Sequence, residues 1–261
     1  MIRRRWAWLA AALALGCAPK SSIPEQAIEE MPPWMSREGG EKVRIELIEQ
    51  LLETGNTIGA IDILHTMRTE GYDTGEIDLL QARALRIDGV GSEAERLLAA
   101  AEKRLPRDAR IPEERCVLFA DEHRVEEAIA QCRRATELDP SRPKSWNNLG
   151  FLLLAAERPD EALEAAEQAL QIDAGDPKYR NNLAMAQAAL GRDEQAFRTF
   201  QSTMPRADAA NMVAQVVERF RGPEEARAWY DRAAQMDRPA GAEPAEPAPA
   251  PVEPAPPQES P

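Results

Sequence analysis

The sequence predicts an all-α fold, an α-solenoid in which about six helical hairpins stack into a curved superhelix. Apolar residues recur at a fixed period, aromatic residues make up only 5% of the 261 residues, and Gly or Pro separates the amphipathic segments. Alanine and leucine carry most of the apolar content, which suits closely packed helices better than a β-sheet. The period is clearest in five alanines that lie 34 residues apart: Ala60, Ala94, Ala128, Ala162 and Ala196.

Residues 1–16 have the composition of an export signal. Arg3, Arg4 and Arg5 precede an uncharged apolar run over residues 6–15. The run is too short to span a bilayer, which takes about 20 apolar residues. A positive start followed by such a run is typical of a secretory signal peptide.

The motif Ala14-Leu15-Gly16-Cys17 follows and resembles the lipobox of bacterial lipoproteins. In that family a diacylglyceryl group is attached to the cysteine, and cleavage makes this cysteine the first residue. The resemblance implies a lipid anchor on Cys17, although Ala14 and Leu15 depart from the usual residues. An ordinary signal peptide with a chance cysteine is the alternative. Ala18 is not the aspartate associated with inner-membrane retention in some bacteria, which implies the outer membrane and a chain facing the periplasm.

Two flanking segments are expected to be linkers. Residues 17–40 contain several prolines and end in a glycine pair, which predicts a flexible tether after the lipidated cysteine. Residues 239–261 hold nine prolines, four glutamates and no basic residue. This second segment has too little apolar surface to fold and is expected to form a disordered Pro/Ala/Glu-rich tail. The repeats are expected between the two, over residues 41–238.

Two further series keep the register of the alanines. Four residues further on lie Leu64, Leu98, Cys132, Ala166 and Phe200. Seven residues further on lie Met67, Ala101, Ala135, Ala169 and Thr203. One hairpin cannot bury its apolar face alone, so neighbouring copies are expected to stack.

The copy that begins at Pro143 carries a recognisable motif. Its positions in order are Trp146, Leu149, Gly150, Leu153, Ala162 and Ala169. This order resembles the tetratricopeptide repeat, whose pattern is Trp, Leu-Gly, Tyr, Ala, Phe and Pro. The copy departs from that pattern at three positions, with Leu153 in place of the tyrosine, Ala166 in place of the phenylalanine and Ala174 in place of the proline. The resemblance implies two helices per copy, with the first helices lining a concave groove.

The last copy is expected to be irregular. Met212 lies 29 residues after Leu183 instead of 34. The second helix of the fifth copy must therefore be short or end by Pro205. The closing helix is then supplied by Ala226, Tyr230 and Ala233.

The first helices carry the candidate binding residues. Two copies place the same residue types at the same offsets, similar to the asparagine ladders that hold peptide backbones in some tetratricopeptide proteins. An amide side chain both donates and accepts, so it can pair with a peptide backbone, and a lysine could receive a carboxylate. Solvated first-helix residues without a ligand are the alternative. The candidate protein-binding residues are Lys144, Asn147, Asn148, Phe151, Lys178, Asn181, Asn182, Met185 and Asn211.

The remaining chemistry predicts no catalytic, cofactor-binding or metal site, and no enzyme activity. The sequence holds two histidines and no HExxH, phosphate loop or nucleophile motif. A formal net charge of −13 argues against nucleic acid as a partner. Cys116 and Cys132 are expected to be buried thiols, with a disulfide across their hairpin as the alternative that export would permit. Glu113 and Glu114 are expected on a solvated face.

The layout of lipobox, tether and repeats resembles several envelope assembly lipoproteins, in particular the tetratricopeptide lipoprotein family of tight-adherence (Flp-type) pilus assembly. The resemblance covers the stretch Tyr179–Asp237 and rests on Arg180–Ala184, Gly191-Arg192, Phe197-Arg198, Ala207–Asn211 and Glu224–Ala234. It implies help for assembly or localisation of an outer-membrane secretin, with an extended peptide or helix of a protein partner in the groove. Type IV pilus pilotins and lipoproteins of outer-membrane barrel assembly are similar in layout. An adaptor of peptidoglycan-acting enzymes is the alternative from another class.

Overall fold

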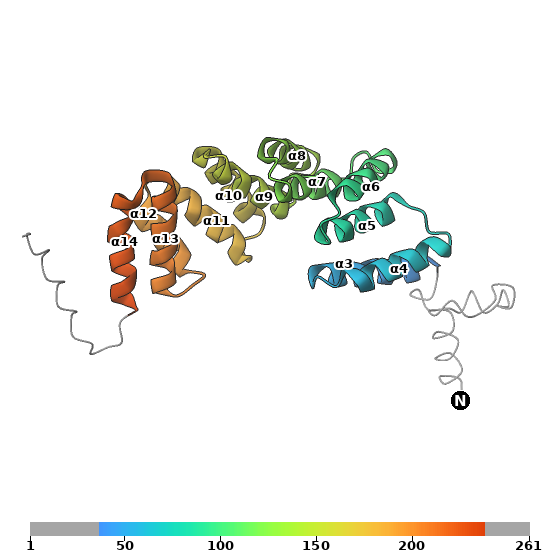
Figure 1. Cartoon of the computed structure of the whole chain (residues 1–261), viewed down its shortest axis with the longest axis horizontal. Coiled ribbons are helices and arrows are strands. Elements are labelled where there is room, and N and C mark those ends of the chain that lie inside the picture. Colours follow the sequence, from blue (N-terminus) through green and yellow to red (C-terminus); the bar gives the residue numbers. More distant parts are fainter. Residues whose placement is uncertain (1–36, 238–261) are drawn as a thin grey trace, which may run out of the picture. The chain divides into compact units, whose positions relative to one another are not determined.

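A computed structural model describes residues 37–237, with side chains from residue 40 onward. This part of the chain is all-α, as predicted, and its twelve helices pair into six hairpins (Figure 1). The predicted signal peptide, Cys17, residues 18–36 of the predicted tether and the predicted tail over 239–261 lie outside the described residues. The last four residues of the predicted tether, 37–40, belong to the first helix, so the repeats begin earlier than predicted. The helices are α3 (Arg37–Glu53), α4 (Thr57–Thr69), α5 (Gly75–Ile87), α6 (Gly91–Arg104), α7 (Arg110–Asp121), α8 (Val125–Leu138), α9 (Pro143–Ala155), α10 (Pro159–Ile172), α11 (Pro177–Ala189), α12 (Asp193–Gln201), α13 (Arg206–Arg221) and α14 (Pro223–Met236).

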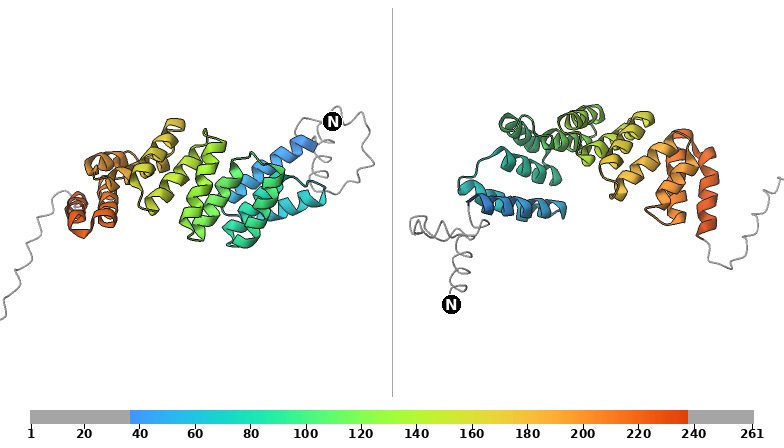
Figure 2. Two further views of the ribbon diagram at one scale, coloured as in Figure 1. Left: turned by 90° about the horizontal axis from the view of Figure 1, so that it is seen from above. Right: turned by 180° about the vertical axis from the view of Figure 1, so that it is seen from behind.

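The hairpins fall into two compact units that divide after Asp173. The amino-terminal unit holds α3 to α10, and the carboxyl-terminal unit holds α11 to α14. Within the amino-terminal unit the first helices α3, α5, α7 and α9 are neighbours, and each second helix also packs on the first helix that follows (Figure 2). Within the carboxyl-terminal unit, α13 packs on both α11 and α12. Each unit therefore has the nearest-neighbour stacking of a repeat protein.

The periodic residues form the contacts between helices. All five alanines of the 34-residue series are at most 1% exposed, and so are all members of the series four residues further on. In the third series Met67, Ala101, Ala135 and Ala169 are fully buried, whereas Thr203 is half-buried. A small side chain at the contact lets two helices pack closely. The alanine methyl groups are still removed from solvent in that contact. The predicted role of these series is confirmed.

Gly150 permits the closest approach within the fourth hairpin. A Cβ atom at this position would lie 3.3 Å from the carbonyl oxygen of Ala162 and 3.5 Å from the Cβ of Ala165. The neighbour that it would crowd is backbone, which yields less readily than a side chain. The absence of a side chain at Gly150 therefore lets α9 lie directly against α10.

Proline and glycine residues mark the ends of several helices. Proline occupies the first helical position of α9, α10, α11 and α14, where its missing N–H removes no hydrogen bond. Gly191 and Gly222 take positive φ values of 77° and 98° between helices. The irregular last copy is confirmed, because α12 has only 9 residues and α13 begins right after Pro205.

The cysteines depart from the main expectation. Cys116 on α7 and Cys132 on α8 form a disulfide with Cα atoms 5.2 Å apart, so the prediction of two free thiols is wrong. Both residues are fully buried. The reason is geometric: the hairpin turn places these two residues opposite each other, at a separation that a disulfide spans without backbone movement.

Two absences hold for the described residues 37–237. No helix there is both long enough and apolar enough to cross a membrane. In the same stretch no three His, Cys, Asp or Glu side chains gather in a way that could hold a metal ion.

Candidate functional site

The candidate residues of the amino-terminal unit share one face of α9. Lys144, Asn147, Asn148 and Phe151 follow the spacing that places side chains above one another on a helix. Lys144 reaches a glutamate on α7, so this face is turned toward the preceding first helix. At the far end of the face the Phe151 ring is 55% exposed.

Lys144 is held by a buried carboxylate that the sequence interpretation placed in solvent. Glu113 on α7 is only 2% exposed, which corrects the prediction of a solvated face. Its Oε1 lies 3.0 Å from the Nζ of Lys144, and its Oε2 lies 3.2 Å from the Nε of Arg142. The fully buried Ser145 donates its hydroxyl to Oε2 at 2.6 Å. Glu113 therefore fixes the start of α9, although it was not among the predicted site residues.

These contacts set the charge state of Glu113. Burial opposes ionisation, but the Lys144 ammonium, the Ser145 hydrogen bond and the Arg142 guanidinium outweigh it and hold the pKa of Glu113 below its ordinary value. The carboxylate is thus ionised at neutral pH. Lys144 and Arg142 both face this carboxylate, and Arg142 also lowers the pKa of Asp108 and of Asp139 electrostatically.

The next two residues of α7 are also buried and paired, and Glu114 too is wrongly predicted as solvated. Glu114 is 6% exposed and lies 3.5 Å from Arg83 and 3.2 Å from Arg86, both on α5. Arg115 is 6% exposed and contacts Glu95 and Glu102 on α6, each at 3.0 Å. Three consecutive charges thus tie α7 to α5, α6 and α9.

On α5 and α7, the residues at the equivalent groove positions make contacts within the protein or are buried. One copy earlier, the position of Lys144 is Arg110, and two copies earlier it is Glu76. Arg110 and Glu76 pair with each other at 2.8 Å. The positions equivalent to Asn147 and Asn148 are the buried Glu113 and Glu114 on α7. Among the first helices α5, α7 and α9, only α9 presents amides together with an exposed aromatic ring.

The two amides of α9 have different surroundings. Asn147 is half-buried and already takes part in a contact. The Nδ2 of Asn148 is covered from solvent and has no hydrogen-bond partner among the described residues. A covered donor without a partner is costly in free energy.

The second set of candidates, on α11 and α13, differs from the first. Asn181 accepts a hydrogen bond of 2.6 Å from the Thr203 hydroxyl, and Asn182 is only 7% exposed. Met185 packs against the core of the carboxyl-terminal unit, Lys178 is exposed, and Asn211 is half-buried. Identical offsets therefore do not give identical environments. The sequence did contain a sign that Asn181 has a partner within the fold, because Thr203 is the polar member of an otherwise apolar series.

Comparisons with known proteins identify the type of repeat. Residues 143–176, which span α9 and α10, match the profile of the tetratricopeptide repeat. No curated protein matches the sequence.

Three solved structures share the fold. One is pilF of Pseudomonas aeruginosa (TM-score 0.60, 19% identity, 77% of this chain and 93% of that chain). Another is YrrB, a tetratricopeptide protein with an unusual peptide-binding site (TM-score 0.54, 17% identity, 67% and 92%). The third is the thermophilic tetratricopeptide protein TTC0263 of Thermus thermophilus (TM-score 0.54, 18% identity, 75% and 99%). At these identities the likeness shows the fold alone, a stack of tetratricopeptide-type hairpins.

The contacts of Glu113 predict a pH-dependent loss of stability. Its pKa is lowered in the folded state, so its contribution is complete above the ordinary carboxyl pKa and is lost as pH falls through the folded value. Glu113→Gln should lower the free energy of unfolding by about 1–3 kcal/mol at neutral pH, with a smaller difference from wild type in acid. Urea denaturation at pH 7 and below pH ~4 measures both values.

The matched control is Glu53→Gln, because Glu53 is exposed at the end of α3. This variant should unfold like the wild type at both pH values. Equal stabilities of Glu113→Gln and Glu53→Gln at neutral pH would contradict the assigned role of Glu113.

Proposed function

We propose that this stack of tetratricopeptide-type hairpins is a membrane-anchored periplasmic scaffold that binds other proteins and catalyses no reaction. The observation that carries the proposal is the face of α9 in the copy that matches the tetratricopeptide profile. There an aromatic ring that is 55% exposed lies beside two amides and a lysine. Exposed aromatic residues are typical anchors of protein interfaces.

The chemistry of this face favours an extended peptide or a helix with an apolar anchor and an acidic group. Phe151 offers apolar area to the anchor. Asn147 and Asn148 offer amides that pair with a backbone without reading its side chains. The exposed Lys144 lies 3.0 Å from the buried Glu113, so its ammonium could also receive a carboxylate of the partner.

The disulfide supports the export part of the proposal. Disulfides such as Cys116–Cys132 form and persist in oxidising compartments, among them the bacterial periplasm. This agrees with the signal peptide expected over residues 1–16 and with lipidation of Cys17. We place the protein at the outer membrane, facing the periplasm, as the residue after Cys17 implies.

Within the envelope we propose a role in assembling a pilus or secretion complex, through assembly or localisation of its secretin. The support is the sequence resemblance to the tight-adherence family, which extends through α11 and α13. The fold shared with pilF of Pseudomonas aeruginosa is compatible with this role. The alternative is a lipoprotein adaptor of outer-membrane barrel assembly or of peptidoglycan-acting enzymes. The identity of the proteins recovered with the chain separates the two.

Replacing the exposed ring should weaken partner capture without weakening the fold. In a pull-down from gently solubilised envelopes, Phe151→Ser should recover several-fold less of the principal partner, because hot-spot aromatics contribute about 2 kcal/mol or more. Ile58→Ser is the matched control, since Ile58 is 75% exposed on α4. Equal recovery by the two variants would contradict a binding role for this face of α9.

Export and anchoring can be separated by two variants. The chain with Cys17→Ser should keep its disulfide, because it is still exported, but should lose membrane association. Removing residues 1–16 from that variant should leave Cys116 and Cys132 reduced, because the cytosol keeps thiols reduced. Maleimide labelling after rapid acid quenching, together with fractionation, measures both. A disulfide that forms equally without residues 1–16 would contradict the export proposal.

A further inference from the structure

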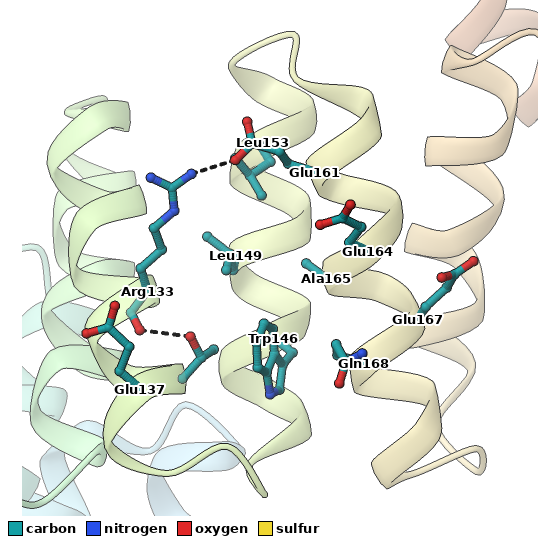
Figure 3. Close-up of a pocket in the computed structure, with 11 residues that line it drawn as sticks. Arg133, Glu137, Trp146, Leu149, Leu153, Glu161, Glu164, Ala165, Glu167 and Gln168 are labelled. Carbon is teal, nitrogen blue, oxygen red and sulfur yellow. Dashed lines mark hydrogen bonds and ion pairs between the residues drawn. The ribbon is translucent and has the colours of Figure 1, made fainter.

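A hollow lies away from the candidate face of α9, in a trough formed by α8, α9 and α10 (Figure 3). Its volume is about 520 Å³, within the range of ligand and peptide sites. The trough uses the side of α9 that carries Trp146, Leu149 and Leu153. All of its lining residues belong to the amino-terminal unit.

The floor of the trough is apolar. Trp146, Leu149 and Leu153 follow one another along α9, and Ala165 of α10 lies beside them (Figure 3). The Trp146 indole donates its N–H to the carbonyl of Pro140 at 2.9 Å, which fixes the ring at the floor. Leu149, Leu153 and Ala165 are only 2–5% exposed, so the half-buried Trp146 ring offers most of the apolar area that a ligand could reach.

The walls of the trough are acidic. Arg133 of α8 pairs with Glu161 of α10 at 2.6 Å, and this ion pair crosses the trough beside Leu153 (Figure 3). Glu137 on α8 and Glu164 and Glu167 on α10 make no ion pair within residues 37–237. The lining thus holds four carboxylates and one guanidinium and carries a formal charge of −3.

We propose that this trough binds a basic amphipathic helix of a protein partner. An apolar residue of that helix rests on Leu149 and Trp146, and its arginine or lysine side chains pair with Glu137 on one wall and with Glu164 and Glu167 on the other. The Trp146 ring adds an attraction for a cation held above it. The apolar floor and the acidic walls together select a basic amphipathic helix. An acidic helix would be repelled by the carboxylates, and a purely apolar helix would leave them unpaired.

The occupant comes from another molecule. The segment 239–261 of this chain has four glutamates and no base, and residues 18–36 hold Lys20 against three glutamates. Both segments therefore share the sign of the trough and are repelled by it. Since the trough and the Phe151 face lie on different sides of α9, one chain can hold two proteins at once.

The test uses the full chain and a fluorescein-labelled synthetic helix of 13 residues, which matches the length of α9. The peptide has leucines on one face and arginines on both flanks, and a second peptide carries glutamate in place of each arginine. Fluorescence anisotropy should show saturable binding of the arginine peptide and none of the glutamate peptide. Circular dichroism of each protein variant checks that its helix content is unchanged.

Charge-reversal variants test whether the peptide binds in the trough. Glu164→Lys with Glu167→Lys should weaken binding of the arginine peptide about tenfold or more, because two close charge pairs become repulsive. Glu53→Lys with Asp62→Lys makes the same change of charge at exposed positions on α3 and α4 and should shift the affinity by no more than about twofold, because the charges are remote and screened.

Three outcomes would overturn the proposal. The first is no binding of the arginine peptide up to about 1 mM, which corresponds to a binding free energy of only about −4 kcal/mol. The second is equal weakening by the two charge-reversal pairs, and the third is loss of binding in Phe151→Ser. The last result would place the peptide on the other side of α9. Unchanged binding in Phe151→Ser supports the trough whether or not the function proposed for the Phe151 face holds.

Discussion

Close packing of small side chains at a 34-residue period is the constraint on which the rest of the structure depends. Every alanine of the series is at most 1% exposed, and Gly150 removes even the methyl group where α9 meets α10. Such contacts bring helices together but bury little area per residue. Cohesion therefore has to come from additional links between neighbours. In the centre of the amino-terminal unit these links are the disulfide and the paired charges of α7.

The same charges decide where the unit is free to bind. Breaking a buried ion pair is costly even when the pair adds little net stability, so Glu113, Glu114 and Arg115 define how α7 meets its neighbours. On α5 and α7 the groove positions are used for this purpose. On α9 they carry amides and an exposed ring instead. The residue type that each copy places at the equivalent positions thus decides whether its first helix stabilises the stack or is free to bind a partner.

The fold could be predicted from the sequence because contacts between helices depend on the period of the apolar residues, and this period can be read directly from the sequence. The three apolar series, the six hairpins and the short α12 could all be predicted. What failed depends on contacts between residues far apart in sequence. Glu113 looks solvated until Arg142 and Lys144 are placed beside it, and Cys116 meets Cys132 only in the folded hairpin. The acidic trough was equally hidden, since its walls come from two hairpins.

The most direct measurement is site-specific photo-crosslinking in intact cells, with benzoylphenylalanine placed in the full chain at position 151 or, as a control, at position 58. The central claim is that α9 contacts a partner protein in the envelope. It predicts a discrete adduct from position 151 that is absent from position 58 and that mass spectrometry identifies as an envelope protein. No adduct from position 151, or the same adducts from both positions, would contradict the claim.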